Sequence, residues 1–287
     1  LNAVGNSRRS LIYLIIAAVS NIFLDIFFVV ILKMGIIGAA LATDISQLLS
    51  CIFILGFLMR SQESYHVRLR DIRFYDNLLG RILKIGLPTG FQNIVISISN
   101  VIVQSSVNSF GAVVMAGYAA YVKVDGFNIL PVLSFSMAAS TFAGQNVGAG
   151  KSKRAKKSMF TGIEVGLVVG CFVFALVFLK GDVLSGFFST DADVIQNGFA
   201  YLKGFAPETI LTAVLFSMIG YFNGNDKTLW VMTQGLIQTL LVRLPMAYIM
   251  SIQPNASLTK IGLAAPVSTA VGIMLNVGFY VYLNRKK

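Results

Sequence analysis

Three side chains in the first two apolar segments have the types and spacing of a cation site. Asp25 is a carboxylate within an apolar stretch, Asn21 lies four residues before it, and Thr43 lies in the next apolar stretch. Residues four apart share a helix face. Asp25 lies about seven residues before the end of its segment and Thr43 about seven residues after the start of the next, so both are roughly 10 Å deep from the same membrane face. Carboxylate, amide and hydroxyl oxygens suit a hard cation such as Na⁺, and a carboxylate at this depth also suits a proton carrier. The alternative is a structural carboxylate that bonds a neighbouring hydroxyl or amide and holds helices together.

A second set of polar side chains follows one face of the third apolar segment. At spacings of 4, 3, 4 and 4 come Asn93, Ser97, Asn100, Gln104 and Asn108. On a helix this face is about 22 Å long. It either lines a wet cavity that offers hydrogen bonds to a bound solute, or bonds helices together at about 0.6 kcal/mol per bond. Five aligned amides and hydroxyls exceed what helix packing requires, so we expect a substrate cavity here.

Among the other charged residues in the apolar segments, five need a partner or a role. Glu208 follows Pro207, which favours a bend, and we assign Glu208 to the substrate cavity, where it either carries a proton or pairs structurally. Lys123 and Asp125 are two residues apart, so they point to different helix faces and each needs another partner. Arg243 is expected to pair with helix-end carbonyls or with an acid. Asp44, next to Thr43, either joins the cation site or faces another helix.

The composition excludes a water-soluble protein. Of 287 residues, 56% are hydrophobic and only 12% are charged, and the mean hydropathy is +0.76. Soluble chains carry about 25% charged residues. Cys51 and Cys171 lie within apolar segments and the single histidine, His66, lies in a charged loop, which argues against a disulfide framework, a zinc site or a buried hydrolase. We therefore expect a membrane protein that is not an enzyme and has no cofactor besides a coupling ion.

Eight segments have the length and apolarity of spanning helices, for which about 20 residues are needed. They cover residues 10–32, 36–59, 82–110, 114–143, 158–180, 194–222, 228–252 and 261–283. The predicted fold class is therefore all-α, a polytopic helical membrane protein with eight transmembrane helices.

The net charge of +11 is distributed as in a membrane protein and not as in a nucleic-acid-binding protein. Alternate gaps between the segments hold 17 of the 23 basic residues, including Arg8, Arg9, the run from Lys151 to Lys157, Lys286 and Lys287. The opposite gaps hold Lys33, Lys180 and Lys260. By the positive-inside rule, the first side and both chain ends are cytoplasmic, in the inner (plasma) membrane of the cell.

Two parts of the chain read alike. Gly5-Asn6-Ser7 precedes one apolar segment and Ile37-Gly38-Ala39-Ala40 begins the next; Gly224-Asn225-Asp226 and Ile261-Gly262-Leu263-Ala264-Ala265 repeat this order. The offset of 219 to 224 residues indicates a parallel duplication, a common plan of transporters. We therefore expect residues 1–60 to be the last two helices of an N-lobe, 61–81 a cytoplasmic linker and 82–287 a six-helix C-lobe. By symmetry, roughly 140 residues and four helices would precede Leu1.

The chain resembles the multidrug and toxic compound extrusion (MATE) transporters over its whole length. The matching stretches are Asn21-Ile22-Phe23-Leu24-Asp25, Gly38 to Thr43, Gly86-Leu87-Pro88, Gly144-Gln145-Asn146-Val147-Gly148-Ala149-Gly150 and Val242-Arg243-Leu244-Pro245. One branch of that family carries a Glu after Gly-Leu-Pro. Residues 89–96 contain no acid, so the chain is more similar to the branch of DNA-damage-inducible protein F.

The resemblance implies two six-helix lobes, a central cavity, and export of organic cations or drugs coupled to Na⁺ or H⁺ entry, by a protein that is a monomer when full length and contributes to antibiotic resistance. It also implies that Asp25, Asn21 and Thr43 hold Na⁺ if coupling is to sodium. The nearest alternative is a lipid-linked oligosaccharide flippase of the same superfamily, which should line its cavity with several cations. A membrane-embedded enzyme or a receptor is the alternative from another class; the first would need clustered catalytic groups, and the second would not explain the repeat.

Overall fold

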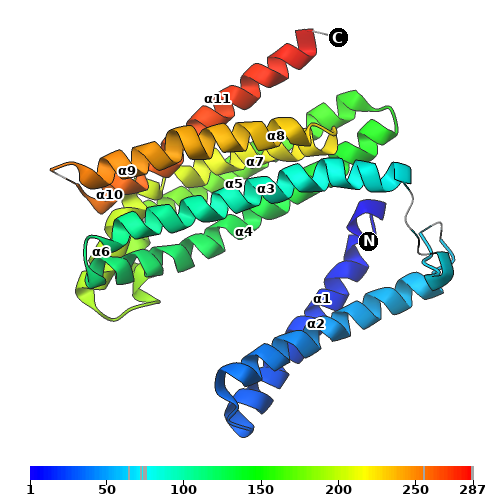
Figure 1. Cartoon of the computed structure of the whole chain (residues 1–287), viewed down its shortest axis with the longest axis horizontal. Helices are drawn as coiled ribbons and strands as arrows, with labels where there is room; N and C mark the ends of the chain where they lie inside the picture. The colour runs from blue at the N-terminus through cyan, green and yellow to red at the C-terminus, as the bar shows by residue number, and fades with distance from the viewer. Residues whose placement is uncertain (64, 72, 74–75, 255, 286–287) are drawn as a thin grey trace. The chain divides into compact units, whose positions relative to one another are not determined.

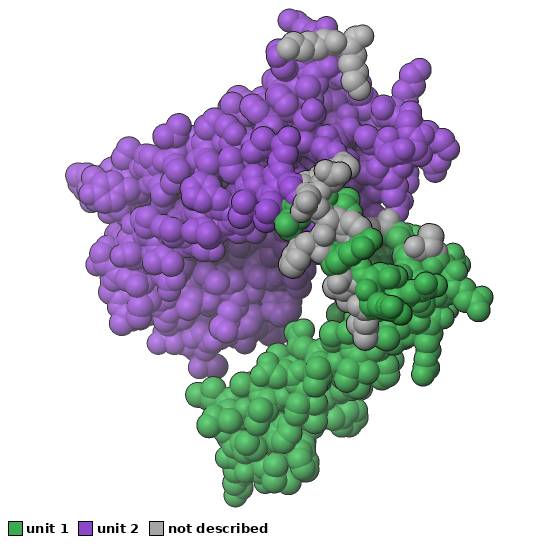
Figure 2. Space-filling model, turned by 45° about the vertical axis from the view of Figure 1, so that its right-hand side comes forward, with its two compact units in different colours: residues 1–79 green, residues 80–287 purple. Residues whose placement is uncertain are grey.

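The computed structural model describes residues 1–63, 65–71, 73, 76–254 and 256–285, and within these ranges the chain forms helices joined by short connections. The expected cytoplasmic residues Lys286 and Lys287 lie outside the described residues. The chain divides into two compact units, Leu1–Leu79 and Gly80–Lys287, coloured separately in Figure 2. Each unit is described by itself.

Unit 1 is a pair of packed helices, α1 (Ser7–Asp25) and α2 (Gly35–Arg60), with short 3₁₀ turns at Asn2–Val4 and Leu69–Asp71. A π-helical turn, Ile26–Ile31, continues α1 directly after Asp25. The chain reverses through Lys33 and Gly35, which both have positive φ angles. Most large apolar side chains of the pair are exposed, as expected for helices that face lipid or further helices.

Unit 2 is a bundle of long helices (Figure 1). In chain order these are α3 (Asp76–Asn108), α4 (Ala112–Gly148), α5 (Ser152–Gly186), α6 (Ala192–Phe205), α7 (Glu208–Gly224), α8 (Thr228–Leu236), α9 (Leu244–Ile252), α10 (Leu258–Gly262) and α11 (Ala264–Arg285). A π-helical segment, Ile237–Arg243, joins α8 to α9 without a break.

The eight predicted spans correspond to these helices. Seven stretches among the described residues are long and apolar enough to cross a membrane, and α6 with α7 makes an eighth if the pair, bent by 48°, is one span. The bend occurs at Pro207, as the sequence predicts. The polytopic helical fold class is confirmed.

Helix α7 packs between α4 and α5 through small residues. A Cβ atom at Gly220 would lie 2.5 Å from the Ser136 carbonyl oxygen of α4, and one at Gly170 would lie 2.8 Å from the Thr209 carbonyl oxygen of α7. Small residues let membrane helices approach closely, which is how such helices associate without a hydrophobic driving force.

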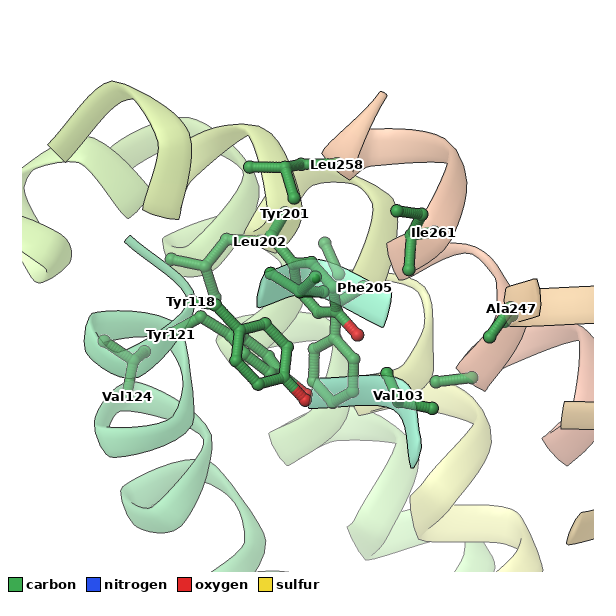
Figure 3. Packing of buried hydrophobic residues seen from close by; sticks show 14 of the residues in the cluster. Val103, Tyr118, Tyr121, Val124, Tyr201, Leu202, Phe205, Ala247, Leu258 and Ile261 are labelled. Carbon is green, nitrogen blue, oxygen red and sulfur yellow. The ribbon is translucent and has the colours of Figure 1, made fainter. Parts of the chain in front are cut away.

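Two clusters of buried apolar side chains occupy the two ends of unit 2. At one end, the rings of Tyr118, Tyr121, Tyr201 and Phe205 contact one another in edge-on and tilted pairs, beside Leu258 and Ile261 (Figure 3). At the other end, Met159, Met218 and Phe222 pack with Trp230 and Phe279. Between the two clusters lies a polar cavity.

Candidate functional site

The cavity of unit 2 has a volume of about 350 Å³ and receives side chains from α3, α4, α6, α7, the α8–α9 segment and α11. Most of its walls are amides, hydroxyls and apolar side chains. Three of its residues carry charge: Asp125 from α4, Glu208 from the first position of α7, and Arg243 from the end of the π-helical segment. Charged groups in membrane-spanning helices are rare and commonly mark a ligand or ion pathway.

Arg243 lies within electrostatic range of both carboxylates, Asp125 and Glu208. From the sequence we expect Arg243 to pair with helix-end carbonyls or with an acid. Within the described part of the chain the guanidinium faces the cavity with the two acids, and no hydrogen bond fixes it to either. The arrangement is a cavity with two acids and one base.

A chain of hydrogen bonds runs through the cavity wall and ends on Glu208. Gln234 Nε2 donates to Gln238 Oε1 (2.6 Å), Gln238 Nε2 donates to Thr269 Oγ1 (3.2 Å), and Thr269 Oγ1 donates to Glu208 Oε1 (2.7 Å). All three hydrogen bonds run in the same direction, from Gln234 toward Glu208. Hydrogen bonds aligned in this manner polarise one another, so the last acceptor, the carboxylate, receives the strongest donor.

Three buried polar atoms of the cavity residues have no hydrogen-bond partner among the residues that the structure describes. They are Glu208 Oε2, Gln234 Oε1 and Asn128 Nδ2. Buried polar atoms in proteins are nearly always bonded, and exceptions often occur where a ligand binds. Two of these three atoms are acceptors, which makes the cavity suited to a ligand that donates hydrogen bonds.

Local chain features place these groups. The break at Pro207 exposes the first turn of α7, so Glu208 points into the cavity and is not hidden along a continuous helix. The π-helical segment that contains Gln238 ends at Arg243, and π-helical turns are frequent at functional sites. Gly272 leaves room for the two glutamines, because a Cβ atom there would lie 2.5 Å from Gln238 Oε1.

The predicted substrate face of α3 is only partly in this cavity. Asn100 lines the cavity together with Glu208, while the other α3 residues in the wall are Gln92 and Ile96. The remaining four predicted residues are exposed on α3 outside it: Asn93, Ser97, Gln104 and Asn108. The cavity therefore contacts α3 along a face next to the predicted one. Contact of the predicted face with water stays a prediction.

In unit 1, the predicted cation residues lie on adjacent packed helices. Asp25 Oδ1 and Asn21 Nδ2 are buried atoms that find no hydrogen-bond partner within the described ranges of the chain. Thr43 is exposed and its hydroxyl donates to the Ala39 carbonyl oxygen (2.9 Å), leaving its oxygen lone pairs available. Asp44 is exposed. No hydrogen bond among the described residues joins Asn21, Asp25 and Thr43 to one another.

Asp125 is the cavity residue that sequence reasoning undervalued. The prediction that Lys123 and Asp125 point to different faces is confirmed, because Lys123 is exposed and Asp125 lines the cavity. Gln234, Gln238 and Thr269 were not anticipated. A usable signal was present: Gln234 and Gln238 are four residues apart in an apolar segment that also holds Arg243.

Comparisons with known proteins place these features in a family. The MatE family model matches residues 88–249. The chain is 28% identical over 251 residues to "Probable multidrug resistance protein YpnP" of Bacillus subtilis, covering 88% of this chain and 56% of that protein. It is 24% identical over 241 residues to "Multidrug export protein MepA" of Staphylococcus aureus, covering 82% and 53%.

Solved structures share the fold. "Crystal structure of MATE in the straight conformation" aligns with a TM-score of 0.89 at 20% identity, covering 98% of this chain and 64% of that one. A "MOP superfamily transporter from Pyrococcus furiosus" aligns with a TM-score of 0.87 at 22% identity, covering 95% and 62%. The chain thus spans between about half and two thirds of the length of the proteins it matches.

Proposed function

The chain belongs to the MatE family, and from this premise we propose that it is part of a secondary exporter of organic cations and drugs, driven by Na⁺ or H⁺ entry. It is a multi-pass membrane protein and a transporter, not an enzyme. The similar proteins are named as multidrug resistance or export proteins, which supports drugs or small organic molecules as substrates.

The carboxylate of Asp25 is the observation that best supports coupled transport. Its buried Oδ1 atom has no hydrogen-bond partner, and the buried amide nitrogen of Asn21 on the same helix is also unpartnered. A π-helical turn begins immediately after Asp25. A carboxylate at this depth of an apolar helix is costly and commonly functional, and its free oxygen is able to accept an ion.

We place the protein in the inner (plasma) membrane with both chain ends cytoplasmic, acting as a monomer by alternating access. In this proposal residues 1–60 belong to a first lobe, residues 61–81 are the linker, and residues 82–287 form the second lobe. The internal repeat supports this assignment, since two related six-helix lobes are a common transporter plan.

The charge of the cavity favours an exporter of cations over a flippase for lipid-linked oligosaccharides. A pyrophosphate-bearing lipid requires several cations around it. The unit 2 cavity offers one, Arg243, against the two carboxylates of Asp125 and Glu208.

The test is dye efflux from vesicles that hold the chain with a complete first lobe, under imposed Na⁺ or H⁺ gradients. We expect Asp25→Asn to abolish gradient-dependent efflux while expression and folding persist, because the amide cannot change charge. Thr43→Ala should lose less, since a hydroxyl supplies a ligand without a charge. Asp182→Asn, which changes an exposed carboxylate of α5, is the matched control and should transport normally. Normal efflux by Asp25→Asn would remove the assignment of the coupling site.

A further inference from the structure

An apolar groove lies between the start of α8 and the second half of α11. Its volume is about 550 Å³, and its lining includes Trp230 of α8 and Met274, Gly278, Phe279 and Tyr282 of α11. The side chains of Met274 and Tyr282 are more than half exposed. None of these residues is in the lining of the polar cavity, so the groove is a separate site.

Gly278 leaves the floor of this groove open. A Cβ atom at Gly278 would have no atom of the described chain within 4 Å. Met274 and Tyr282 lie one helical turn to either side of it, on the same face of α11. Glycine is unfavourable inside a helix, and in membrane helices it commonly lets a neighbour approach the backbone. The space above Gly278 therefore fits a slender, flexible chain that lies along α11.

Trp230 forms one wall of the groove with its apolar surface. Its ring stacks on Phe279 with the centroids 4.1 Å apart, and its Nε1 atom donates to Asn276 Oδ1 (2.9 Å). Tryptophan near a membrane surface often directs this N–H toward the headgroups. Here the N–H is satisfied by Asn276, which is fully buried. The wall therefore offers apolar contact, which suits a hydrocarbon chain.

Two cationic side chains lie just beyond the groove, at one end of it. Lys227 directly precedes α8, three residues before Trp230, and Arg285 ends α11, three residues after Tyr282. Both are exposed. Asp226 precedes Lys227 in the same turn, so these three side chains leave one net positive charge.

This end of the groove lies at the level of the lipid headgroups. Helix α8 begins one span and α11 ends another, and both spans are long enough to cross a membrane. Basic residues between spanning helices at this level are typical of sites for anionic headgroups. An apolar groove that ends in positive charge is complementary to an amphiphile with an anionic head.

We propose that this groove holds one phospholipid with an anionic headgroup, its acyl chain along Gly278 beside Trp230 and its phosphate at Lys227 and Arg285. The proposal requires only that the chain lies in a membrane. It does not depend on the exported substrate, the coupling ion or the direction of transport, so its failure would leave the proposed function standing, and the reverse also holds.

Trp230 provides the measurement, because it is the only tryptophan of the chain and its fluorescence reports on this groove. The full chain is reconstituted in phosphatidylcholine nanodiscs that contain a small fraction of a phospholipid with brominated acyl chains. Bromine quenches tryptophan fluorescence on contact. The two probes are phosphatidylglycerol, which is anionic, and phosphatidylcholine, which is zwitterionic, with the same brominated chains. We expect brominated phosphatidylglycerol to quench Trp230 with an apparent affinity at least about fivefold higher.

Gly278→Leu tests the groove itself. The new side chain fills the space without a clash, so the protein should fold and lose the preference for phosphatidylglycerol. Gly278→Ala keeps most of the space and should retain the preference. The matched control is Gly90→Leu, since Gly90 is an exposed helical glycine of α3 whose Cβ atom would also have no neighbour within 4 Å. It should behave as wild type.

The headgroup contacts are tested by charge. Lys227→Gln with Arg285→Gln should reduce the preference to about one, while quenching in fully brominated phosphatidylcholine persists. Asp226→Asn should increase the preference, and asparagine tolerates the positive φ of 59° at this position.

A control variant separates a bound lipid from a general attraction to positive charge. Lys153→Gln with Lys157→Gln removes the same charge from exposed positions at the start of α5. The neighbouring Lys156 contacts Tyr280 and Asn284, which lie on a different face of α11 from Gly278 and Tyr282. This control should therefore keep the preference for phosphatidylglycerol.

Four results would overturn the proposal. They are equal quenching by the two lipids, a preference that survives loss of Lys227 and Arg285, an equal loss in the Lys153 and Lys157 control, and a preference unchanged by Gly278→Leu. A dimer of the purified chain that Gly278→Leu dissociates would also overturn it, since a second copy would then occupy the groove.

Discussion

At the scale of single residues, the hydroxyl of Thr269 stabilises the buried carboxylate of Glu208 in unit 2. Thr269 is 1% exposed and its hydroxyl donates to Glu208 Oε1, while Oε2 has no partner. Removal of one partner from a buried polar pair costs more than the bond itself contributes, because the remaining group stays desolvated. Loss of the Thr269 hydroxyl would therefore leave Glu208 Oε1 without the donor that it has in this structure.

Thr269→Val tests this dependence. The substitution keeps the shape of the side chain and removes the donor, so we expect a loss of about 1–3 kcal/mol in the free energy of unfolding. Thr269→Ser should recover most of it. The measurement is the thermal unfolding midpoint in detergent, with Thr233→Val as the control, since the exposed Thr233 hydroxyl donates only to Leu229 of its own helix. A Thr269→Val midpoint equal to that of Thr233→Val would show that the bond to Glu208 is dispensable.

Single charges in apolar stretches could be predicted from the sequence, but their partners could not. Asp25 and Glu208 stand out because an ionisable group in a spanning helix needs a reason to be there. The hydrogen bonds from Gln234 to Glu208 join α8, the π-helical segment, α11 and α7, which lie together only because these helices fold back on one another. Such contacts depend on packing that residue spacing does not encode.

At the scale of elements, α3 presents two polar faces. Gln92 and Asn100 line the cavity, while Asn93, Ser97, Gln104 and Asn108 are exposed. The spacing of 4, 3, 4 and 4 predicts a polar face, of which Asn100 lines the cavity. Sequence spacing locates a face on its own helix, but the rotation of that helix against its neighbours decides which face meets the cavity.

Cysteine scanning of α3 tests whether the predicted face is wet. In a background with Cys51 and Cys171 replaced by serine, cysteines at 93, 97, 100, 104 and 108 should react with a water-soluble maleimide, because thiolate formation needs water. Cysteines at the exposed apolar positions Val168 and Phe172 of α5 should resist, since lipid surrounds them. If the α3 positions resist as those two do, the face is buried in lipid or protein.

The membrane spans could be predicted because a run of about 20 apolar residues is a strong signal. The π-helical departures from α-helix could not be predicted. Pro207 predicts the bend that the structure has between α6 and α7. The π-helical segments Ile26–Ile31 and Ile237–Arg243 contain neither proline nor glycine. One extra residue in a turn is compatible with the same apolar pattern, so the sequence gives no local cue for it.

At the scale of the whole molecule, unit 2 has a basic end and an acidic end. Lys156 donates to the Asn284 side chain, which joins the start of α5 to the end of α11, and Gly144 lies against Gly224, which brings the α7–α8 connection to the same end. The run from Lys151 to Lys157, Lys227 and Arg285 therefore share one end. Asp182, Asp191 and Asp193 belong to the opposite end, around the α5–α6 connection.

The last prediction is that the basic end faces the cytoplasm, because positive loops resist transfer across the membrane. In the same cysteine-free background, Lys153→Cys and Thr190→Cys place one thiol at each end of unit 2. Both residues are exposed, so only the membrane should decide their access to reagent. In intact cells a membrane-impermeant maleimide should label Thr190→Cys and not Lys153→Cys, and permeabilisation should expose Lys153→Cys. The reverse pattern would place both chain ends outside. The Na⁺ or H⁺ gradient would then reach Asp25 from the wrong side for export. That result would therefore contradict both the proposed orientation and the proposed direction of transport.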